Sequence, residues 1–296
     1  MPKIFAIVVT YEPDQYLLSQ LILALSPQVT GGVVINNGHS LPISDEDLKQ
    51  ANFEVQHLED NIGVASALNL GFRWAQEKKA EFVVTFDQDS RPVPDMVFKL
   101  FSAYQALVAS GKKVGAVGSQ LIDRRTGRRA HFLAPVAGMR RKIFPVEGES
   151  IEVDHLITSG CFVPMNVWCE VGFFLDALFI DYVDIEWSLR MRHHGWHLFG
   201  VGDAILIHSI GDNTKEWAGK TISYHSPLRH YFMVRNGIYL QKLPYISFGW
   251  KFSEIIQIIK KIIFFGWMGR PRIAHIRAMW LGLCDGWYGR LGPKIR

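Results

Sequence analysis

Short apolar runs alternate with longer amphipathic segments between residues 3 and 118. In 14–25, leucines recur at a helical spacing, and the segments 61–74 and 94–109 are also interpreted as helices. Runs of mainly apolar or β-branched residues predict strands at 3–9, 31–35, 53–57, 82–86 and 114–118. Strands that alternate with helices of about ten or more residues are typical of βαβ units. We therefore expect an α/β fold with a mostly parallel central sheet flanked by helices.

Polar residues follow three of these strands directly. Residues 10–12 (TYE) come after the first strand, residues 36–38 (NNG) after the second, and residues 87–89 (DQD) after the fourth. In sheets of this kind, ligands bind outside the carboxyl ends of the strands. We therefore expect these three segments to meet at one edge of the sheet and to form a binding site there.

The next part of the chain is less regular. Residues 124–142 carry seven Arg or Lys and are interpreted as an exposed loop or hairpin. Residues 156–163 and 198–207 are apolar enough to be buried strands. Helices are predicted to start at Pro164, where proline is tolerated in the first turn, and to run from Asp184 to His194.

Residues 252–265 predict an amphipathic helix. It is too short to span a bilayer, and its lysines and glutamate interrupt the apolar sequence. Its polar residues fall on one stripe: Ser253, Glu254, Gln257, Lys260 and Lys261. Trp and Arg residues follow, which is typical of a helix at a membrane interface. The alternative is that the apolar side packs on the rest of the protein or on a second subunit.

The amino-acid composition adds little to the choice of fold class and function. The chain has 296 residues, of which 48% are hydrophobic and 20% charged, as in ordinary globular proteins. Its three cysteines are too few for a disulfide framework and indicate a reducing compartment. The N-terminus does not resemble a signal peptide. The formal charge of +4 is concentrated in the C-terminal part, which suits an anionic surface, and we expect no nucleic-acid partner.

The two carboxylates of Asp87 and Asp89 are the first candidate chemistry. A lone D-x-D is most often a solvated turn at a strand end. The alternative is a site for Mg²⁺ or Mn²⁺, which prefer oxygen ligands and often complete their shell with phosphate oxygens. Without a cation, each carboxylate raises the pKa of the other, so we expect the site to be weakly ordered until cation and nucleotide diphosphate arrive together.

Eight motifs occur in an order that resembles glycosyltransferase family 2, and more narrowly its bacterial rhamnosyltransferase branch. They are IVVTYEP (7–13), VVINNGHS (33–40), NIGVASALNLGF (61–72), TFDQDS (85–90), TSGCFVP (158–164), DYVDIEWSLR (181–190), HSIGD (208–212) and HSPLRHYFMVRN (225–236). The resemblance covers residues 4–240, and the tail GLCDGWYGRLG also fits that branch. It implies a GT-A fold, a nucleotide-sugar donor and inversion at the anomeric carbon.

The resemblance also implies roles for individual residues. It assigns nucleotide-sugar contacts to Thr10, Tyr11, Glu12, Asn36, Asn61, Gly63, Asp87, Gln88 and Asp89. It assigns metal contacts to Asp89, Asp87 and His208. The family often has an aspartate where this chain has Asn36, so the contact to the nucleobase stays open.

The same resemblance places a general base in the segment DYVDIEWSLR. Asp184 is the first candidate and Asp181 the second, because the two share a helix face if the helix extends back that far, whereas Glu186 does not. Amide dipoles near a helix start keep a carboxylate ionised, which suits a base. Either aspartate could instead cap the helix.

Three further residues have two interpretations each. Trp187 either stacks on the acceptor sugar or fills the core. Arg229 and Arg235 either clamp phosphates, whose geometry matches an Arg fork, or pair with acidic residues.

The resulting hypothesis is an inverting, metal-dependent transfer of L-rhamnose from dTDP-L-rhamnose to a lipid-linked polysaccharide intermediate of the O-antigen type. We expect a catalytic domain at 1–240, with a nucleotide-sugar half (1–120) and an acceptor half (121–240), and a membrane-peripheral helical extension at 241–296. The protein would lie in the cytoplasm against the inner face of the bacterial cell membrane. The alternatives are another nucleotide sugar, a polyprenyl phosphate acceptor, or a non-catalytic nucleotide-sugar-binding subunit.

Overall fold

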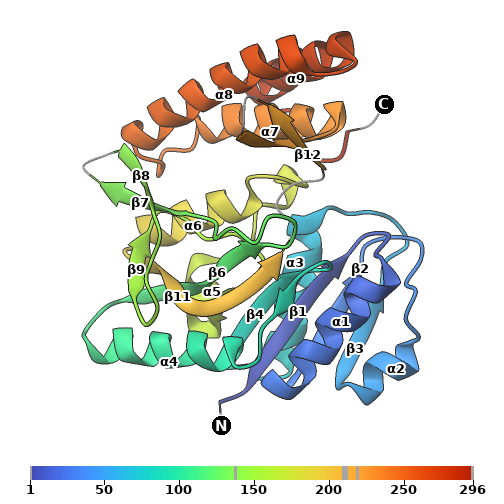
Figure 1. Cartoon of the computed structure of the whole chain (residues 1–296), viewed down its shortest axis with the longest axis vertical. Coiled ribbons are helices and arrows are strands. Elements are labelled where there is room, and N and C mark those ends of the chain that lie inside the picture. The colour runs from blue at the N-terminus through green and yellow to red at the C-terminus, as the bar shows by residue number, and fades with distance from the viewer. Residues whose placement is uncertain (1, 137–138, 209–212, 218–219, 295–296) are drawn as a thin grey trace.

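The computed structural model describes residues 2–136, 139–208, 213–217 and 220–294. At its centre lies a nine-stranded sheet with the order β3-β2-β1-β4-β10-β6-β11-β5, and β9 pairs with β11 beside this path (Figure 1). The strands of the N-terminal half are parallel, as predicted: β1 (Ile4–Thr10), β2 (Gly31–Asn36), β3 (Phe53–His57) and β4 (Phe82–Asp87).

The remaining part of the sheet is mixed. It contains β5 (Arg91–Pro92), β6 (Val114–Asp123), β9 (Ser150–Val153), β10 (Cys161–Pro164) and β11 (His197–His208). β6 and β11 are parallel, but β10 runs antiparallel between β4 and β6. The strand predicted over 156–163 begins only at Cys161. The prediction was wrong for 156–160, because Leu156 is buried in a loop and gives the same apolar signal as a strand.

Helices cover both faces of the sheet and form two cores. One face carries α1 (Gln15–Leu25), α2 (Asp45–Gln50) and α4 (Met96–Ala109), and the other carries α3 (Val64–Glu77), α5 (Met165–Val171) and α6 (Val183–His193). Because successive strand residues point to opposite faces, Ile7 joins the core under α3 and Val8 joins the core under α1. The predicted helices of this region are confirmed, with starts shifted by one to three residues.

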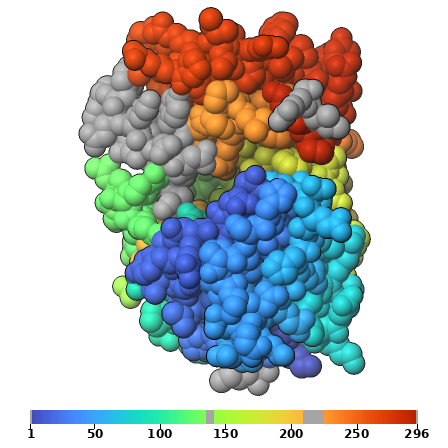
Figure 2. Space-filling view, turned by 90° about the vertical axis from the view of Figure 1, so that its right-hand side faces the viewer, coloured from blue at the N-terminus to red at the C-terminus, as the bar shows by residue number. Residues whose placement is uncertain are grey.

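The C-terminal part of the chain forms a helical layer on one end of the sheet (Figure 1). It consists of α7 (Pro227–Leu240), α8 (Phe248–Met268) and α9 (Arg272–Tyr288). Val234, Ile258, Phe265 and Met279 form its small apolar core, with contributions from all three helices. In the space-filling view, the C-terminal helices lie as a slab above the N-terminal half (Figure 2).

The polar stripe expected along 252–265 forms only part of the outer face of α8, where Gln257 and Lys260 are exposed. Glu254 lies in that stripe, yet it is only 5% exposed. The exposed side of α8 also carries large apolar residues: Phe248, Phe252, Ile259, Ile263 and Trp267. Part of the apolar surface therefore packs inward on α7 and α9, and another part faces outward without cover from the described chain.

Two small hairpins complete the fold. β7 (Phe132–Val136) pairs with β8 (Met139–Ile143), which confirms a hairpin in the Arg-rich segment. β12 (Asn213–Trp217) pairs with β13 (Lys220–Tyr224). Within the described ranges, no helix combines the length and the apolar character needed to cross a bilayer.

Candidate active site

The ends of three parallel strands meet at one edge of the sheet, as the sequence predicts. In the strand register, Thr10 lies opposite Asn36, and Val9 lies opposite Asp87. The hydroxyl of Thr10 also donates a hydrogen bond to Oδ1 of Asn36 at 3.3 Å. The side chains that follow β1, β2 and β4 therefore share one site.

Asp87 and Asp89 lie beside His208, which ends β11. Nε2 of His208 is 3.7 Å from Oδ2 of Asp87, and its Nδ1 is 3.3 Å from Oδ1 of Asp89. A pair of hydroxyls supports this group: Ser90 Oγ lies 2.5 Å from Ser159 Oγ and 3.2 Å from His208 Nδ1. We call Asp87, Asp89, Ser90, Ser159 and His208 the acidic corner.

Burial and like charge act together on Asp87. Its side chain is 42% exposed, and desolvation by the surrounding protein atoms raises its pKa above the ordinary value. The positive charge of protonated His208 lowers that pKa, whereas the charges of Asp89 and Asp184 raise it. The direction agrees with the sequence argument, but burial contributes more than the neighbouring carboxylate does.

The donor set of the acidic corner fits a hard divalent cation. The carboxylates of Asp87 and Asp89 supply oxygen ligands, and His208 supplies a ring nitrogen. In the parts of the chain that the structure describes, no three His, Cys, Asp or Glu side chains form a preformed metal cage. Mg²⁺ needs no such cage, since one or two carboxylates and the oxygens of a bound diphosphate suffice.

The loop after β1 is fixed by side chains for which the resemblance implies nucleotide contacts. The amide of Gln88 bonds both ways with Tyr11, because Oε1 accepts from its backbone N–H at 2.6 Å and Nε2 donates to its carbonyl at 3.1 Å. Glu12 accepts from the backbone N–H of His39 at 2.9 Å and from the hydroxyl of Ser40 at 3.0 Å. Those hydrogen bonds lower the pKa of Glu12. Gln88 and Glu12 therefore shape the loops, and Tyr11 remains exposed.

Asparagines join the loop after β2 to the start of α3. Asn36 is 2% exposed, and its Nδ2 lies 3.2 Å from Nδ1 of His57. Asn37 donates from Nδ2 to Oδ1 of Asn61 at 3.1 Å and accepts from the backbone N–H of Ile62 at 2.8 Å. The sequence analysis placed Asn37 at this edge together with Asn36 but assigned it no contact of its own.

Gly63 is required by close backbone contact. Its φ is +86°, and a Cβ atom there would lie 2.6 Å from the carbonyl oxygen of Phe179. That same carbonyl accepts a hydrogen bond from the N–H of Val64 at 2.7 Å. The start of α3 is thereby joined to the segment that leads into α6.

Asp181 and Asp184 do not share a helix face. The helix α6 starts at Val183, and both Asp181 and Tyr182 have left-handed φ values of 61° and 63°. The carboxylate of Asp181 is 3.3 Å from Nε and Nη2 of Arg229 and is 10% exposed. The helix does not extend back to Asp181, so the condition for a shared face is not met, and the two aspartates have different environments.

Asp184 is half-buried in the first turn of α6. Its Oδ1 accepts from the backbone N–H of Ile185 at 2.8 Å, and its side chain lines a small cavity with Thr158 and Cys161. Burial raises the pKa of Asp184, while protonated His155 and backbone N–H groups lower it. The helix start was expected to keep this group ionised, but burial outweighs the amide groups.

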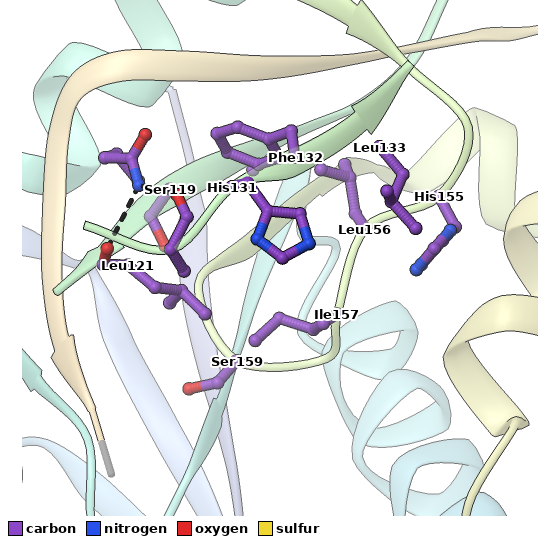
Figure 3. Close-up of a pocket in the computed structure, with 12 residues that line it drawn as sticks. Ser119, Leu121, His131, Phe132, Leu133, His155, Leu156, Ile157 and Ser159 are labelled. Carbon is purple, nitrogen blue, oxygen red and sulfur yellow. Dashed lines mark hydrogen bonds between the residues drawn. The ribbon is translucent and has the colours of Figure 1, made fainter. Parts of the chain in front are cut away.

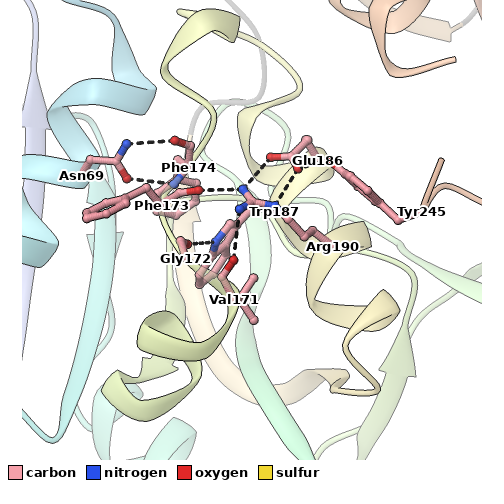
Figure 4. A network of polar contacts seen from close by, with 9 residues as sticks. All are labelled: Asn69, Val171, Gly172, Phe173, Phe174, Glu186, Trp187, Arg190 and Tyr245. Carbon is pink, nitrogen blue, oxygen red and sulfur yellow. Dashed lines mark hydrogen bonds and ion pairs between the residues drawn. The ribbon is translucent and has the colours of Figure 1, made fainter. Parts of the chain in front are cut away.

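Buried polar contacts hold α6 in place (Figure 4). Glu186 is fully buried, pairs with Nε of Arg190 at 2.8 Å, and accepts a short hydrogen bond from the hydroxyl of Tyr245. Nη2 of Arg190 also donates to the carbonyl of Phe173 at 2.7 Å. These contacts fix the orientation of the turn that carries Asp184.

Trp187 belongs to the core. It is 2% exposed, and its Nε1 donates to the carbonyl of Gly172 at 2.9 Å. Its ring packs against Phe174 and Phe72. The structure therefore supports the core interpretation, and Trp187 also borders the small cavity that Asp184 lines.

Arg235 is buried as well, at 1% exposure, and does not reach the acidic corner. Its guanidinium donates to the carbonyls of Leu178 at 2.9 Å and Gly292 at 2.5 Å. Beside it, Nδ2 of Asn236 lies within 3.0 Å of the carbonyls of Leu178, Ile180 and Asp181. Both residues hold the segment before α6, so Arg235 acts through the backbone rather than on a phosphate.

The contacts of Arg229 are compatible with both of its interpretations, a phosphate clamp and an ion pair with an acidic residue. It pairs with Asp181, as the alternative to a phosphate clamp states, yet its charge also lowers the pKa of Asp87. Arg229 is thus an electrostatic neighbour of the acidic corner. Arg124 approaches the same corner by donating from Nη2 to the carbonyl of Asp89 at 2.9 Å.

Comparison with solved structures defines the class of fold. The chain resembles GalNAc-T7 with UDP, GalNAc and Mn²⁺, with a TM-score of 0.58 and 14% identity over 88% of this chain and 58% of that one. It resembles S. aureus TarS 1–349 in complex with UDP-GlcNAc with the same TM-score and identity, over 97% of this chain and 82% of that one. These similarities confirm the GT-A fold.

Sequence comparison defines the family. Residues 7–156 match the model of glycosyl transferase family 2. Over 263 residues the chain is 34% identical to the dTDP-rhamnosyl transferase RfbF of Shigella flexneri, which covers 86% of this chain and 85% of that protein. The chain therefore belongs to glycosyltransferase family 2 and is a glycosyltransferase.

The contacts of Asn236 predict that this side chain stabilises the segment before α6. Asn236→Ala removes hydrogen bonds to three carbonyls and to the guanidinium of Arg235. We expect a loss of about 1–3 kcal/mol in the free energy of unfolding, because buried polar groups lose partners. Denaturant unfolding measures it, with Gln241→Ala at the end of α7 as control. A loss no larger than in the control would contradict this role.

Proposed function

We propose that this protein is an inverting, metal-dependent glycosyltransferase that transfers L-rhamnose from dTDP-L-rhamnose to a lipid-linked saccharide of the O-antigen type. Similarity to the dTDP-rhamnosyl transferase RfbF over most of both chains supports the donor. The observation that carries the proposal is the position of Asp184, which lines one small cavity with Thr85 of β4, the strand that ends at Asp87. A carboxylate beside a candidate diphosphate site is what direct displacement requires.

In this proposal the first half of the chain, residues 1–120, binds the nucleotide sugar. Tyr11 and the loop held by Gln88 and Glu12 would face the base and ribose. Thr10 and Asn36, at the ends of β1 and β2, would support that loop. Asn61 and Gly63 would bring the start of α3 close to the nucleotide. Glycine permits that approach because it adds no side chain.

Asp87, Asp89 and His208 would hold a Mg²⁺ or Mn²⁺ ion. When bound, such an ion supplies positive charge that neutralises the diphosphate leaving group. Arg229 lies near enough to act on Asp87 and would add positive charge on the same side. Asp181 keeps Arg229 in place through the ion pair between them.

Asp184 would be the general base in the acceptor half, residues 121–240. Its carboxylate takes the proton of the acceptor hydroxyl while that oxygen forms a bond to the anomeric carbon. The bond from this carbon to the diphosphate oxygen breaks, dTDP leaves with the bonding electrons, and the configuration inverts. The raised pKa of Asp184 makes it a stronger base than an ordinary aspartate.

The helical extension would place the enzyme in the cytoplasm against the inner face of the bacterial cell membrane. Exposed apolar residues of α9 continue those of α8: Ile273, Ile276, Trp280, Trp287 and Tyr288. Exposed basic residues lie on the same helices and in the turn between them, where Arg270 stands: Lys260, Arg270, Arg272 and Arg277. Trp favours the headgroup level, and Lys and Arg favour anionic lipids, so this composition suits contact with a lipid surface.

The donor and metal assignment predicts the behaviour of an Asp89→Ala variant. Wild-type protein with Mg²⁺ or Mn²⁺ should release dTDP from dTDP-L-rhamnose in preference to a panel of other nucleotide sugars. Asp89→Ala should lose metal-dependent donor binding in calorimetry, because a carboxylate ligand is gone. Glu77→Ala, an exposed carboxylate on α3, is the control. Equal binding by Asp89→Ala and wild type would refute the site.

The base assignment predicts both turnover and pH dependence. Asp184→Asn should keep donor affinity and lower kcat by roughly 10²-fold or more. Since burial raises the pKa of Asp184, wild-type kcat should fall on acidification at a pH above the ordinary aspartate value of about 3.9. Stopped assays over a pH series measure both. Full activity of Asp184→Asn would reassign the base.

The membrane assignment predicts weaker vesicle binding when exposed tryptophans are replaced. The double variant Trp267→Ser/Trp280→Ser should bind phosphatidylglycerol vesicles at least roughly tenfold more weakly, because each indole buries a large apolar area at the interface. Leu23→Ser, an exposed apolar residue on α1, is the control. Unchanged sedimentation with vesicles would contradict the assignment. Light scattering that shows a dimer for the wild type and a monomer for the double variant would contradict it as well.

A further inference from the structure

A cavity of about 160 Å³ lies beside the acidic corner, on the side away from β1 (Figure 3). Its walls come from β6, from the start of the β7 hairpin and from the loop that precedes β10. The lining residues include Gln120, Ala130, His131, Phe132, His155 and Ile157. In the close-up, the ring of His131 projects toward the middle of this space.

The cavity touches the reaction centre at two points. Ser159 lines it, and the same hydroxyl accepts the backbone N–H of Asp87 at 3.2 Å. Leu156 and Ile157 line both this cavity and the smaller one that contains Asp184. A molecule held here would therefore lie next to both the acidic corner and the general base proposed above.

The chemistry of the walls suits an uncharged, hydroxyl-rich ring. Two histidine rings line the cavity: His131 is exposed, and the side chain of His155 is 15% exposed, with its Nδ1 3.7 Å from Oδ2 of Asp154. A neutral imidazole has one nitrogen that donates and one that accepts a hydrogen bond, so these two rings suit the hydroxyls of a ligand. Phe132 and Ile157 add apolar surface of the kind that covers the face of a sugar ring.

The charge of the lining residues and the volume of the cavity limit which ligands it can bind. None of the described residues that line the cavity is Lys, Arg, Asp or Glu. A phosphate group would need cationic or multiple N–H donors. Drug-sized ligands occupy pockets of roughly 300–1,000 Å³, so this cavity has room for one ring rather than several.

We infer that this cavity is the acceptor subsite and binds one neutral sugar ring, the terminal sugar of the acceptor, through His131 and His155. The inference rests on the proposed function, and it selects a saccharide acceptor over polyprenyl phosphate. The ring contributes the hydroxyl that Asp184 deprotonates. Specificity for the acceptor then lies in β6 and the β7 hairpin, separate from the residues that hold the donor.

The test starts from wild-type protein with dTDP-L-rhamnose and Mn²⁺. The acceptor probes are octyl glycosides of neutral hexoses, a deoxyhexose and an N-acetylhexosamine, with undecaprenyl phosphate as a separate arm. Mass spectrometry identifies the product. Transfer to one of the glycosides is expected. Transfer only to undecaprenyl phosphate overturns the inference but not glycosyl transfer, whereas failure to bind any nucleotide sugar overturns the proposed function as well.

Two variants then probe the cavity itself. His131→Ala should raise the KM for the best glycoside by roughly 3- to 10-fold, as expected for one lost hydrogen bond. Ala130→Phe should fill the space and abolish use of the glycoside. Both should keep the wild-type Kd for dTDP-L-rhamnose. Arg128→Ala, exposed on the same segment and outside the cavity lining, is the matched control.

A higher KM for the glycoside with an unchanged Kd for dTDP-L-rhamnose distinguishes the loss of an acceptor subsite from a folding defect. Thermal unfolding of each variant shows whether it is folded, and His131→Ala, at an exposed position, carries the test if Ala130→Phe does not fold. An unchanged glycoside KM in folded His131→Ala, or an equal loss in Arg128→Ala, overturns the inference.

Discussion

The constraint on which the site depends is the repulsion among carboxylates gathered at one edge of the sheet. Two unit charges about 4 Å apart interact by about 4 kcal/mol at an effective dielectric constant of about 20. In this protein Asp89 and Asp184 both raise the pKa of Asp87, and burial raises it more. His208 and Arg229 offset part of this cost. The arrangement is therefore costly without a ligand and suits a cation and a diphosphate that arrive together.

The rest of the structure holds these charges in place. The sheet register brings Thr10, Asn36 and Asp87 to one edge. On the other side, α6 is fixed by Glu186 and Arg190, while Asn236 holds the backbone before it. Buried polar contacts of this kind specify a single arrangement when every partner is present.

The helical layer connects that arrangement to the outer face of α8. The hydroxyl of Tyr182 donates a short hydrogen bond to Glu254, whose helix exposes Phe252 and Ile259 on another side. One helix thus contacts the segment that leads into α6 and also presents apolar surface outward.

The sequence was sufficient for the strands of the N-terminal half and for the meeting of their ends, because both follow from periodicity and from the geometry of parallel sheets. It was insufficient wherever a polar or aromatic residue is buried by partners distant in the chain. Arg235 is held by the carbonyl of Gly292, and Trp187 by that of Gly172. The start of α6 was predicted at Asp184, one residue after the observed start, but the left-handed backbone at Asp181 and Tyr182 escaped prediction. Ser159 lies within the motif TSGCFVP, so a signal for it was present.

The most direct measurement is a crystal structure of the protein with dTDP-L-rhamnose and Mn²⁺, in the Asp184→Asn variant to slow turnover. The account predicts that Mn²⁺ bridges the diphosphate and the carboxylate of Asp89, with the side chain at position 184 facing the anomeric carbon from the opposite side. A diphosphate bound away from Asp87 and Asp89, or position 184 remote from the anomeric carbon, would contradict it.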